Sequence, residues 1–162
     1  LLKLVTQNVD GLHFKAGNSR EATIEIHGSA LSAYCIECGA GHDRQEVHER
    51  VVSGQAVPLC TECEGPLKPA TVSFGQAMPE RETREAFEAA ADCDLMIVIG
   101  SSLVVYPAAA LPDEATRAGA ELVIVNREPT DKDPLARALL RGAAGESMSL
   151  MARLSGLGNG AG

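Results

Sequence analysis

Residues 94–102, "DLMIVIGSS", decide the fold. Their apolar run (95–99) has the length of a strand and no polar alternation, which is typical of a parallel strand covered on both faces. The run at 120–126, "AELVIVN", has the same character. Amphipathic helices are predicted before and between these strands, at 79–94 and 109–119, the second ending at Gly119. This alternation predicts a Rossmann-like α/β fold of three layers, a parallel sheet with helices on both faces.

The remaining elements extend this pattern in both directions. Strands are predicted at 3–8 ("KLVTQN"), 22–29 ("ATIEIHGS", half-buried and ending at Gly28) and 70–75 ("ATVSFG"). Helices are predicted at 133–142 ("DPLARALLRG"), with Asp133 as N-cap and Pro134 in the first turn, and at 145–154. Residues 1–30 and 68–155 therefore form the main domain, 31–67 a small module, and 156–162 a flexible tail.

The small module is marked by two C-x2-C pairs, separated by residues 39–59. This spacing is close to that of a tetrahedral zinc site with four thiolate ligands, Cys35, Cys38, Cys60 and Cys63. Free thiols or thioredoxin-like redox pairs are the alternative. Four protein ligands leave no position for water, so the zinc is expected to be structural, with His42 and His48 outside its shell. Cys93 is predicted to be a small apolar filler.

Composition excludes several classes of function. The net charge of -8, and an acidic cysteine module, argue against nucleic-acid binding. No apolar run has the length of a membrane span and no signal-peptide pattern is found, which predicts no membrane association and a cytoplasmic protein. In that compartment cysteines are metal ligands or free thiols rather than disulfides.

Polar residues follow the two central strands where each one ends. Gly100, Ser101 and Ser102 have the form of a phosphate-binding turn, and Asn126 and Glu128 stand where a doubly wound fold binds a ribose diol. A plain turn and a solvated loop acid are the alternatives. Together the two strand ends favour a dinucleotide site.

A histidine ends the predicted strand at 22–29. His27 is either a hydrogen-bonded structural residue or a general base, since imidazole changes protonation near neutral pH. His13 presents the same choice, with a packing role favoured.

Taken in order and spacing, "TQNVDGLHFKAG", "EIHGS", the two cysteine pairs, "KPATVSFGQAMP", "VIGSSLVVYPAAALP" and "VNREPTDKD" resemble the sirtuins, NAD-dependent protein deacylases, over residues 5–154. The resemblance implies a Rossmann-type NAD domain bearing a structural zinc module. It implies His27 and Asn8 as catalytic residues and acyl-lysine proteins or peptides as partners. NAD-binding positions would be Gln7, Asn8, Asp10, Gly100, Ser101, Ser102, Asn126, Glu128 and Ala144, and substrate-binding positions Ser73, Phe74, Gly75, Val104 and Val105.

The chemistry that the resemblance implies consumes NAD. The acyl-lysine carbonyl oxygen attacks C1′ of the nicotinamide ribose, and nicotinamide departs. Neutral His27 then takes a proton from a ribose hydroxyl, whose oxygen attacks the resulting imidate carbon. Water completes the reaction, which yields free lysine and O-acyl-ADP-ribose, and the zinc takes no part.

Two departures from the family pattern stand out. Gln76 replaces the glutamate of Phe-Gly-Glu, which removes a carboxylate near the substrate groove. The Gly-Ala-Gly-x-Ser loop and the helical module that selects the acyl group precede Thr-Gln-Asn in sirtuins and are absent here. The sequence is therefore expected to be a fragment with little activity alone. An inactive NAD- or ADP-ribose-binding fragment and a zinc-scaffolded interaction module are the alternative functions.

Overall fold

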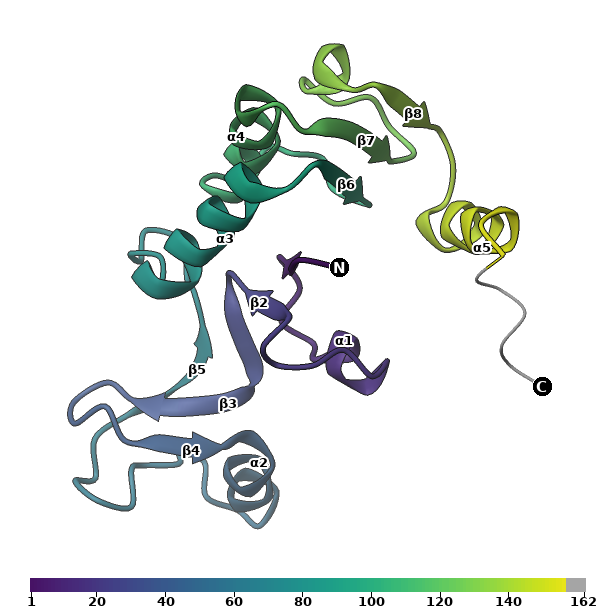
Figure 1. Ribbon diagram of the computed structural model, residues 1–162. Coiled ribbons are helices and arrows are strands. Elements are labelled where there is room, and N and C mark those ends of the chain that lie inside the picture. The colour runs from purple at the N-terminus through teal and green to yellow at the C-terminus, as the bar shows by residue number, and fades with distance from the viewer. Residues whose placement is uncertain (157–162) are drawn as a thin grey trace. The chain divides into compact units, whose positions relative to one another are not determined.

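The computed structural model describes residues 1–156 and divides the chain into two compact units, Leu1–Arg84 and Glu85–Gly162 (Figure 1). No helix among the described residues is long and apolar enough to cross a membrane.

In the first unit the elements are β1 (Leu4–Thr6), α1 (Leu12–Lys15), β2 (Thr23–Glu25), β3 (Gly28–Cys35), β4 (Gly41–Asp43), α2 (Arg44–Val52) and β5 (Leu67–Thr71). Helix α3 (Glu80–Asp92) crosses the division and confirms the helix expected at 79–94. In the second unit they are β6 (Leu95–Ile99), η1 (Ala108–Ala110), α4 (Leu111–Ala118), β7 (Glu121–Val125), η2 (Asp133–Leu135), β8 (Ala138–Leu140) and α5 (Ala144–Leu154).

The first unit is built from two small sheets. Strands β1 and β2 pair in parallel, with Val5 opposite Ile24. Strands β4, β3 and β5 form an antiparallel sheet in that order, and α2 lies beside β3 and β4 (Figure 1). The Asp43 carboxylate starts α2 by accepting hydrogen bonds from the backbone N–H groups of Gln45 and Glu46.

One strand of the prediction is two strands in the structure. The segment 22–29 was expected to run unbroken to Gly28, but β2 ends at Glu25 and β3 begins at Gly28. Gly28 has a φ of 75°, and a Cβ placed on it would lie 2.1 Å from the carbonyl oxygen of Ala70. Only glycine permits both the backbone angle and this approach, so the chain changes sheets here.

The strand expected at 70–75 lies earlier in the chain. It is β5, which begins at Leu67, paired with Cys35, and ends at Thr71, paired with Gly28. Beyond Thr71 no described strand continues the antiparallel sheet. Residues 73–76 turn instead, where the backbone N–H of Gln76 donates to the carbonyl of Ser73 at 2.9 Å. Pairing with β3, rather than apolar pattern, fixes where this strand ends.

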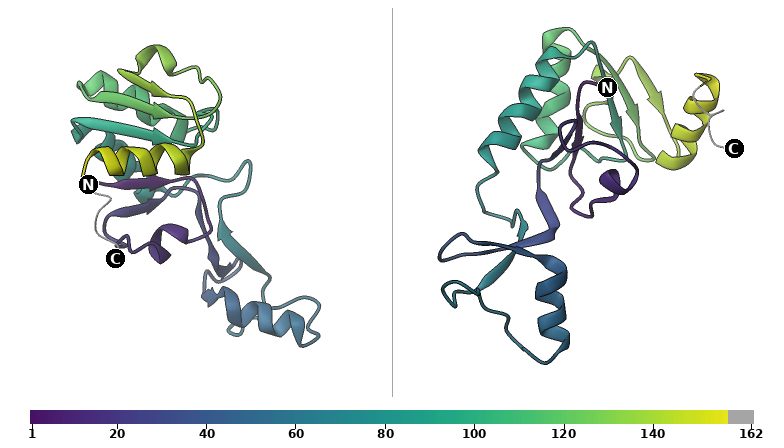
Figure 2. Two further views of the ribbon diagram at one scale, coloured as in Figure 1. Left: turned by 90° about the vertical axis from the view of Figure 1, so that its right-hand side faces the viewer. Right: turned by 60° about the horizontal axis from the view of Figure 1, so that its bottom comes forward.

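The second unit contains a parallel sheet in the order β6-β7-β8 (Figure 2). Its core gathers the inward side chains of β7, Leu122 and Ile124, with Leu103 and Ala109 from the following segments. Helix α4 packs on β6 and β7 and ends at Gly119, whose φ of 106° confirms the expected C-cap. Parallel strands joined through helices are the arrangement predicted for an α/β fold.

Two expectations about this sheet are wrong. The segment 133–142 is not a helix: η2 begins at the expected place, but Ala138–Leu140 form strand β8. The backbone N–H of Arg137 donates to the carbonyl of Leu122 at 2.8 Å, so pairing with the edge of β7 replaces helical hydrogen bonds. Strand β6 is not covered on both faces, since Leu95 and Ile97 are 52% and 38% exposed.

The last helix agrees with its prediction, because α5 covers the residues expected at 145–154. The flexible tail predicted at 156–162 lies outside the described residues except for Gly156.

We predict that Gly28→Ala destabilises the first unit by more than about 3 kcal/mol, because the new methyl group clashes with a backbone carbonyl that cannot move aside. Gly17→Ala is the matched control. Its φ is 91°, but nothing lies within 4 Å of the added Cβ, so it should cost only about 1 kcal/mol. Urea unfolding followed by circular dichroism measures both variants. Equal losses would show that the contact with Ala70 is unimportant.

Candidate functional site

The four cysteine sulfurs of the two C-x2-C pairs come together in the first unit. Their Sγ atoms all lie within 4.8 Å of one another, with Cys35 and Cys63 at 3.5 Å and Cys38 and Cys60 at 3.7 Å. Tetrahedral zinc with Zn–S bonds of about 2.3 Å requires sulfurs about 3.8 Å apart. The donor set and its geometry fit one structural zinc ion, as predicted.

The protonation of these thiols shows why a cation suits the cluster. The backbone N–H of Cys38 stabilises a thiolate at Cys35 and lowers the pKa of that thiol to about 7. At Cys63 the N–H of Gly65 also favours the thiolate, but hydrogen bonding with the sulfurs of Cys38 and Cys35 outweighs it and raises the pKa to about 12. Several thiolates repel one another at this distance, and a divalent cation removes that repulsion.

The turns around the sulfurs are tightly fitted. Gly65 is buried, and a Cβ at that position would lie 2.8 Å from the sulfur of Cys35. The backbone N–H of Cys60 donates to the carbonyl of Gly65 at 2.8 Å, and that of Cys35 to the carbonyl of Ala40 at 2.9 Å. Cys35 and Cys60 are buried, whereas Cys38 and Cys63 are exposed, so one side of the cluster faces solvent.

His27 sits where the chain passes from β2 to β3. Its Nδ1 lies 3.1 Å from the carbonyl oxygen of Gln7, and its own carbonyl accepts the N–H of Val72 at 3.0 Å. A carbonyl oxygen can only accept, so Nδ1 carries the proton. In the neutral ring Nε2 therefore holds a lone pair and can accept a proton.

Of the polar residues that follow β1, Gln7 contacts this histidine. The hydroxyl of Thr6 accepts the backbone N–H of Asn8 at 3.1 Å, which turns the chain out of the strand. The carboxylate of Asp10 accepts the N–H of Leu12 at 3.0 Å and so starts α1. The structure thus joins Gln7 to His27 directly and leaves the side chains of Asn8 and Asp10 exposed.

The turn after β6 is held by hydrogen bonds and contains one strained residue, Leu103. Gly100 has a φ of 62°, and its N–H donates to the carbonyl of Val125 at 2.8 Å. Leu103 also has a positive φ, 56°, although it is not glycine, and its side chain is buried in the core. The hydroxyl of Ser101 accepts the N–H of Leu103 at 3.2 Å. Strain of this kind is concentrated at functional sites.

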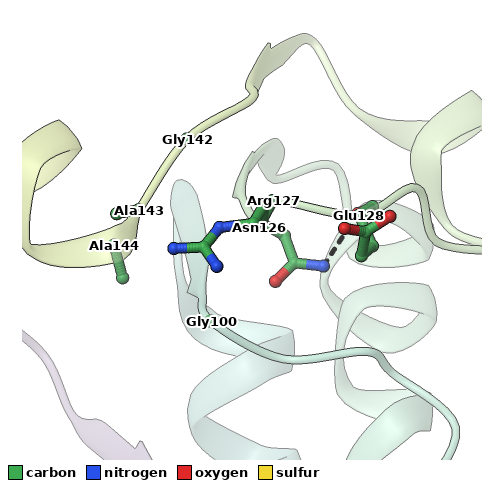
Figure 3. Close-up of a pocket in the computed structure, with 7 residues that line it drawn as sticks. All are labelled: Gly100, Asn126, Arg127, Glu128, Gly142, Ala143 and Ala144. Carbon is green, nitrogen blue, oxygen red and sulfur yellow. Dashed lines mark hydrogen bonds between the residues drawn. The ribbon is translucent and has the colours of Figure 1, made fainter.

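A pocket opens at the carboxyl ends of the strands in the second unit (Figure 3). Its volume is about 360 Å³. Four of the predicted NAD-binding residues line it: Gly100, Asn126, Glu128 and Ala144. The side-chain amide of Asn126 donates to the backbone carbonyl of Glu128 at 2.8 Å. Ser101 and Ser102 follow Gly100 but are not among the residues that line the pocket.

Three further residues line this pocket and were not predicted: Arg127, Gly142 and Ala143. Gly142 and Ala143 could have been predicted if β8 had been recognised as a strand. Residues that follow parallel strands gather at one edge of the sheet, and these two follow β8 as Gly100 follows β6. The helix expected at 133–142 concealed it, since Gly142 then served only as a helix end. Arg127 could have been predicted because it lies between Asn126 and Glu128, which were both expected at the site.

The predicted substrate-binding residues lie in exposed segments of separate units. Ser73, Phe74 and Gly75 are exposed in the first unit, and the oxygen of the Gln76 side chain accepts the N–H of Ser73 at 3.2 Å. Val104 and Val105 are 65% and 41% exposed in the second unit. None of these residues belongs to a described strand.

The remaining residues considered from the sequence lie apart from these sites. His13 belongs to α1, His48 is exposed on α2, and His42 lies in β4 with a buried Nε2 that has no hydrogen-bond partner. Among residues 1–156, the cluster of candidate metal ligands contains the four cysteines and neither His42 nor His48. Burial raises the pKa of the Cys93 thiol, which donates to the carbonyl of Ala90 at 3.3 Å.

Comparison with known proteins identifies the family. The family model described as "Sir2 family" matches residues 1–107. The chain belongs to the Sir2 family. This membership confirms the resemblance inferred from the motifs. Rhodopseudomonas palustris has an "NAD-dependent protein deacetylase" that is 47% identical over 145 residues, which are 90% of this chain and 57% of that protein. A Streptomyces coelicolor protein of the same description, numbered 2, is 41% identical over 157 residues, 97% of this chain and 64% of that protein.

Solved Sir2 structures share the fold of this chain. The structure described as "Sir2 bound to acetylated peptide" matches with a TM-score of 0.91 and 37% identity over 96% of this chain and 64% of that one. The structure described as "Sir2-p53 peptide-NAD+" matches with a TM-score of 0.90 at the same identity. The Rossmann-like α/β fold is thereby confirmed. The chain spans 57% of the Rhodopseudomonas palustris relative that it matches.

We predict that the purified protein holds one zinc ion per chain and that Cys60→Ala abolishes its binding. Structural zinc stabilises small modules by about 10–16 kcal/mol, so removal of the ion by a chelator should unfold the segment between β3 and β5. Metal analysis by mass spectrometry and circular dichroism measure the two effects. Cys93→Ala is the control and should retain the ion. Full zinc content in Cys60→Ala would contradict the assignment.

Proposed function

We propose that this Sir2-family chain is part of an NAD-dependent protein-lysine deacylase that releases nicotinamide and O-acyl-ADP-ribose. Similarity to proteins described as NAD-dependent deacetylases and deacylases supports the activity. Two separate features of the chain support the site. One is a histidine whose Nδ1–H is held by a carbonyl, so that Nε2 can accept a proton. The other is a pocket at the strand ends of a Rossmann-like sheet.

The hydrogen bond between His27 and the carbonyl of Gln7 is the observation that carries the proposal. It fixes the imidazole with Nε2 unprotonated in the neutral ring, which is the form a general base requires. The same hydrogen bond ties the base to the Gln7–Asn8 segment, which we propose lines the nicotinamide-ribose site with Asp10. His27 would take the proton of a ribose hydroxyl, and Asn8 would act beside it at the nicotinamide-ribose end.

The pocket in the second unit would take the adenosine half of NAD. Glu128 and Asn126 offer a carboxylate and an amide that can bind ribose hydroxyls. Gly100 allows the backbone to approach a phosphate closely, and Ser101 and Ser102 provide hydroxyl donors next to it. Ala144 would lie beside the adenine. The zinc ion would hold the small module and take no part in the reaction.

The substrate would be an acylated lysine within a protein or peptide. We propose that residues 73–75 and residues 104–105 pair with the substrate backbone as an added strand. These residues are exposed and lie outside the described strands, and pairing at Ser73 would replace its two hydrogen bonds with Gln76. We propose that residues 1–30 and 68–155 form an NAD-binding domain and that residues 31–67 form a zinc module. Cysteines that form no disulfide and can ligate a metal are typical of a reducing compartment, which supports a cytoplasmic location.

The activity test measures nicotinamide release from NAD with an acetylated peptide, in the protein carrying this chain. We predict that His27→Ala lowers turnover about 10²–10⁴-fold while NAD still binds, because only the proton acceptor is lost. His48→Ala, on the exposed face of α2, is the control and should keep full turnover. An unchanged rate in His27→Ala would reduce His27 to a structural residue.

Calorimetry with ADP-ribose separates the alternatives if no nicotinamide is released. Binding of ADP-ribose without turnover would identify an inactive nucleotide-binding chain. Absence of both would leave a zinc-scaffolded interaction module.

We predict that Glu128→Ala raises the KM for NAD about tenfold and leaves kcat nearly unchanged. The carboxylate would bind a ribose far from the bond that breaks, so it would contribute equally to the ground state and the transition state. Glu121→Ala is the matched control, because Glu121 is exposed at the opposite end of β7. A fall in kcat with unchanged KM would place Glu128 at the reacting atoms instead.

A further inference from the structure

The loop that carries Asn126 and Glu128 is anchored by a guanidinium outside the pocket lining. Arg141 directly follows β8, and its Nη1 donates to the backbone carbonyl of Glu128 at 3.2 Å, with a longer contact of 3.5 Å to that of Asn126. Its Nη2 is hydrogen-bonded to the carboxylate of Asp133. One side chain therefore contacts both ends of the loop.

Asp133 closes the loop from its far end. Its carboxylate accepts the hydroxyl of Thr130 at 2.8 Å in addition to the guanidinium of Arg141. The side chain of Asp133 is 18% exposed and that of Arg141 is 35% exposed, so the pair is partly shielded from water. Partial burial raises the pKa of Asp133, but the hydrogen bonds from Thr130 and the charge of Arg141 outweigh it and hold this pKa below its usual value.

Few other contacts fix the position of Glu128. Besides Arg141, its carbonyl receives only the side-chain amide of Asn126 among the hydrogen bonds of the described residues. Lys132 is paired with Asp113 of α4, which holds the outer side of the loop. The N–H of Asn126 donates to the carbonyl of Leu140 at 3.1 Å and fixes the start of the loop. Removing Arg141 therefore leaves residues 127–129 without their inner anchor.

We propose that Arg141 and Asp133 form a clamp that positions Glu128 and Asn126 for nucleotide binding. The clamp rests on the proposed function, since it assumes that this pocket takes the adenosine half of NAD. Arg141 is a positioning residue and not a ligand residue, because it does not line the pocket. Its planar fork suits this task, since it can serve two carbonyls and a carboxylate at once.

The first experiment measures the Kd of ADP-ribose by calorimetry for the wild-type chain and three variants of the clamp. Arg141→Met should weaken binding about tenfold, the equivalent of one lost charged hydrogen bond. Arg141→Lys keeps the charge without the fork and should weaken binding about threefold. Asp133→Asn keeps the shape of the partner and should also weaken binding, which tests the clamp even if Arg141→Met folds poorly.

Arg137→Met is the matched control. Arg137 precedes the same strand, and its guanidinium is paired with the exposed carboxylate of Glu121 at 3.7 Å, away from the loop. This variant removes the same charge and should bind ADP-ribose like the wild type. An equal loss in Arg137→Met would mean that net charge, rather than the clamp, sets the affinity.

A double-mutant cycle distinguishes positioning from simple stabilisation of the fold. If Arg141 acts through Glu128, then Arg141→Met should cost less than about threefold in a Glu128→Ala background. A general loss of folded protein would instead multiply the two effects. Thermal unfolding of each variant provides the folded fraction at the temperature of calorimetry.

The outcomes separate the clamp from the deacylase. Wild-type affinity in both Arg141→Met and Asp133→Asn, or multiplied losses in the cycle, overturns the clamp and leaves the proposed activity untouched. No ADP-ribose binding by the wild-type chain overturns the clamp together with the nucleotide site. Clamp-dependent binding of ADP-ribose, without nicotinamide release by the protein carrying this chain, supports the clamp and refutes the deacylase.

Discussion

The close passage of Gly28 past Ala70 is the constraint on which the first unit depends. At this point the chain leaves the parallel pair of β1 and β2 and enters the antiparallel sheet that holds the cysteines. His27 directly precedes Gly28. Its side chain is hydrogen-bonded to the carbonyl of Gln7, and its own carbonyl accepts a hydrogen bond from the N–H of Val72. The candidate base thus sits between the two sheets because the backbone must cross there. A residue with a side chain at position 28 would move both the sheet and the histidine.

The cysteine cluster shows a second kind of dependence, on a bound ion. The backbone N–H of Cys38 lowers the pKa of Cys35. At Cys63 the N–H of Gly65 favours the thiolate, but hydrogen bonding with the neighbouring sulfurs outweighs it and raises the pKa. Outside this cluster the small module has little apolar burial: of the residues of α2, only Val47 is buried. A segment with such a small core requires a metal to fold stably. The structural role of zinc therefore follows from packing as well as from the number of ligands.

Sequence reasoning succeeded where a residue type determines local geometry. Gly119 ends α4, two C-x2-C pairs bring four sulfurs together, and the apolar runs form β6 and β7. It failed where pairing with a neighbouring strand decides the secondary structure. Residues 138–140 have helical propensity, and only the open edge of β7 makes them a strand. Likewise, β5 ends at Thr71 because its pairing with β3 ends there, whatever the apolar pattern of residues 72–74.

The same distinction applies to the pocket. Gly100, Asn126 and Glu128 were found because they follow apolar runs that are visible in the sequence. Arg141 was not, because its contact with the carbonyl of Glu128 depends on β8 pairing with β7. Pocket-lining residues that follow β6 and β7 could be predicted from the strand ends, whereas Gly142, Ala143 and the anchoring Arg141 emerge only from the pairing of β8 with β7.

Local charge around the pocket differs from that of the whole chain, and an anionic dinucleotide would need this difference. The chain has a net charge of -8, which disfavours long-range attraction of phosphates. At the pocket, however, Arg127 balances the carboxylate of Glu128, and Ala143 and Ala144 place the start of α5 beside Gly100. Free backbone N–H groups at a helix start favour negative charge within the first turn. Affinity for a phosphate would therefore arise at short range, from groups that the strand ends bring together, and it would depend on loop position more than on total charge.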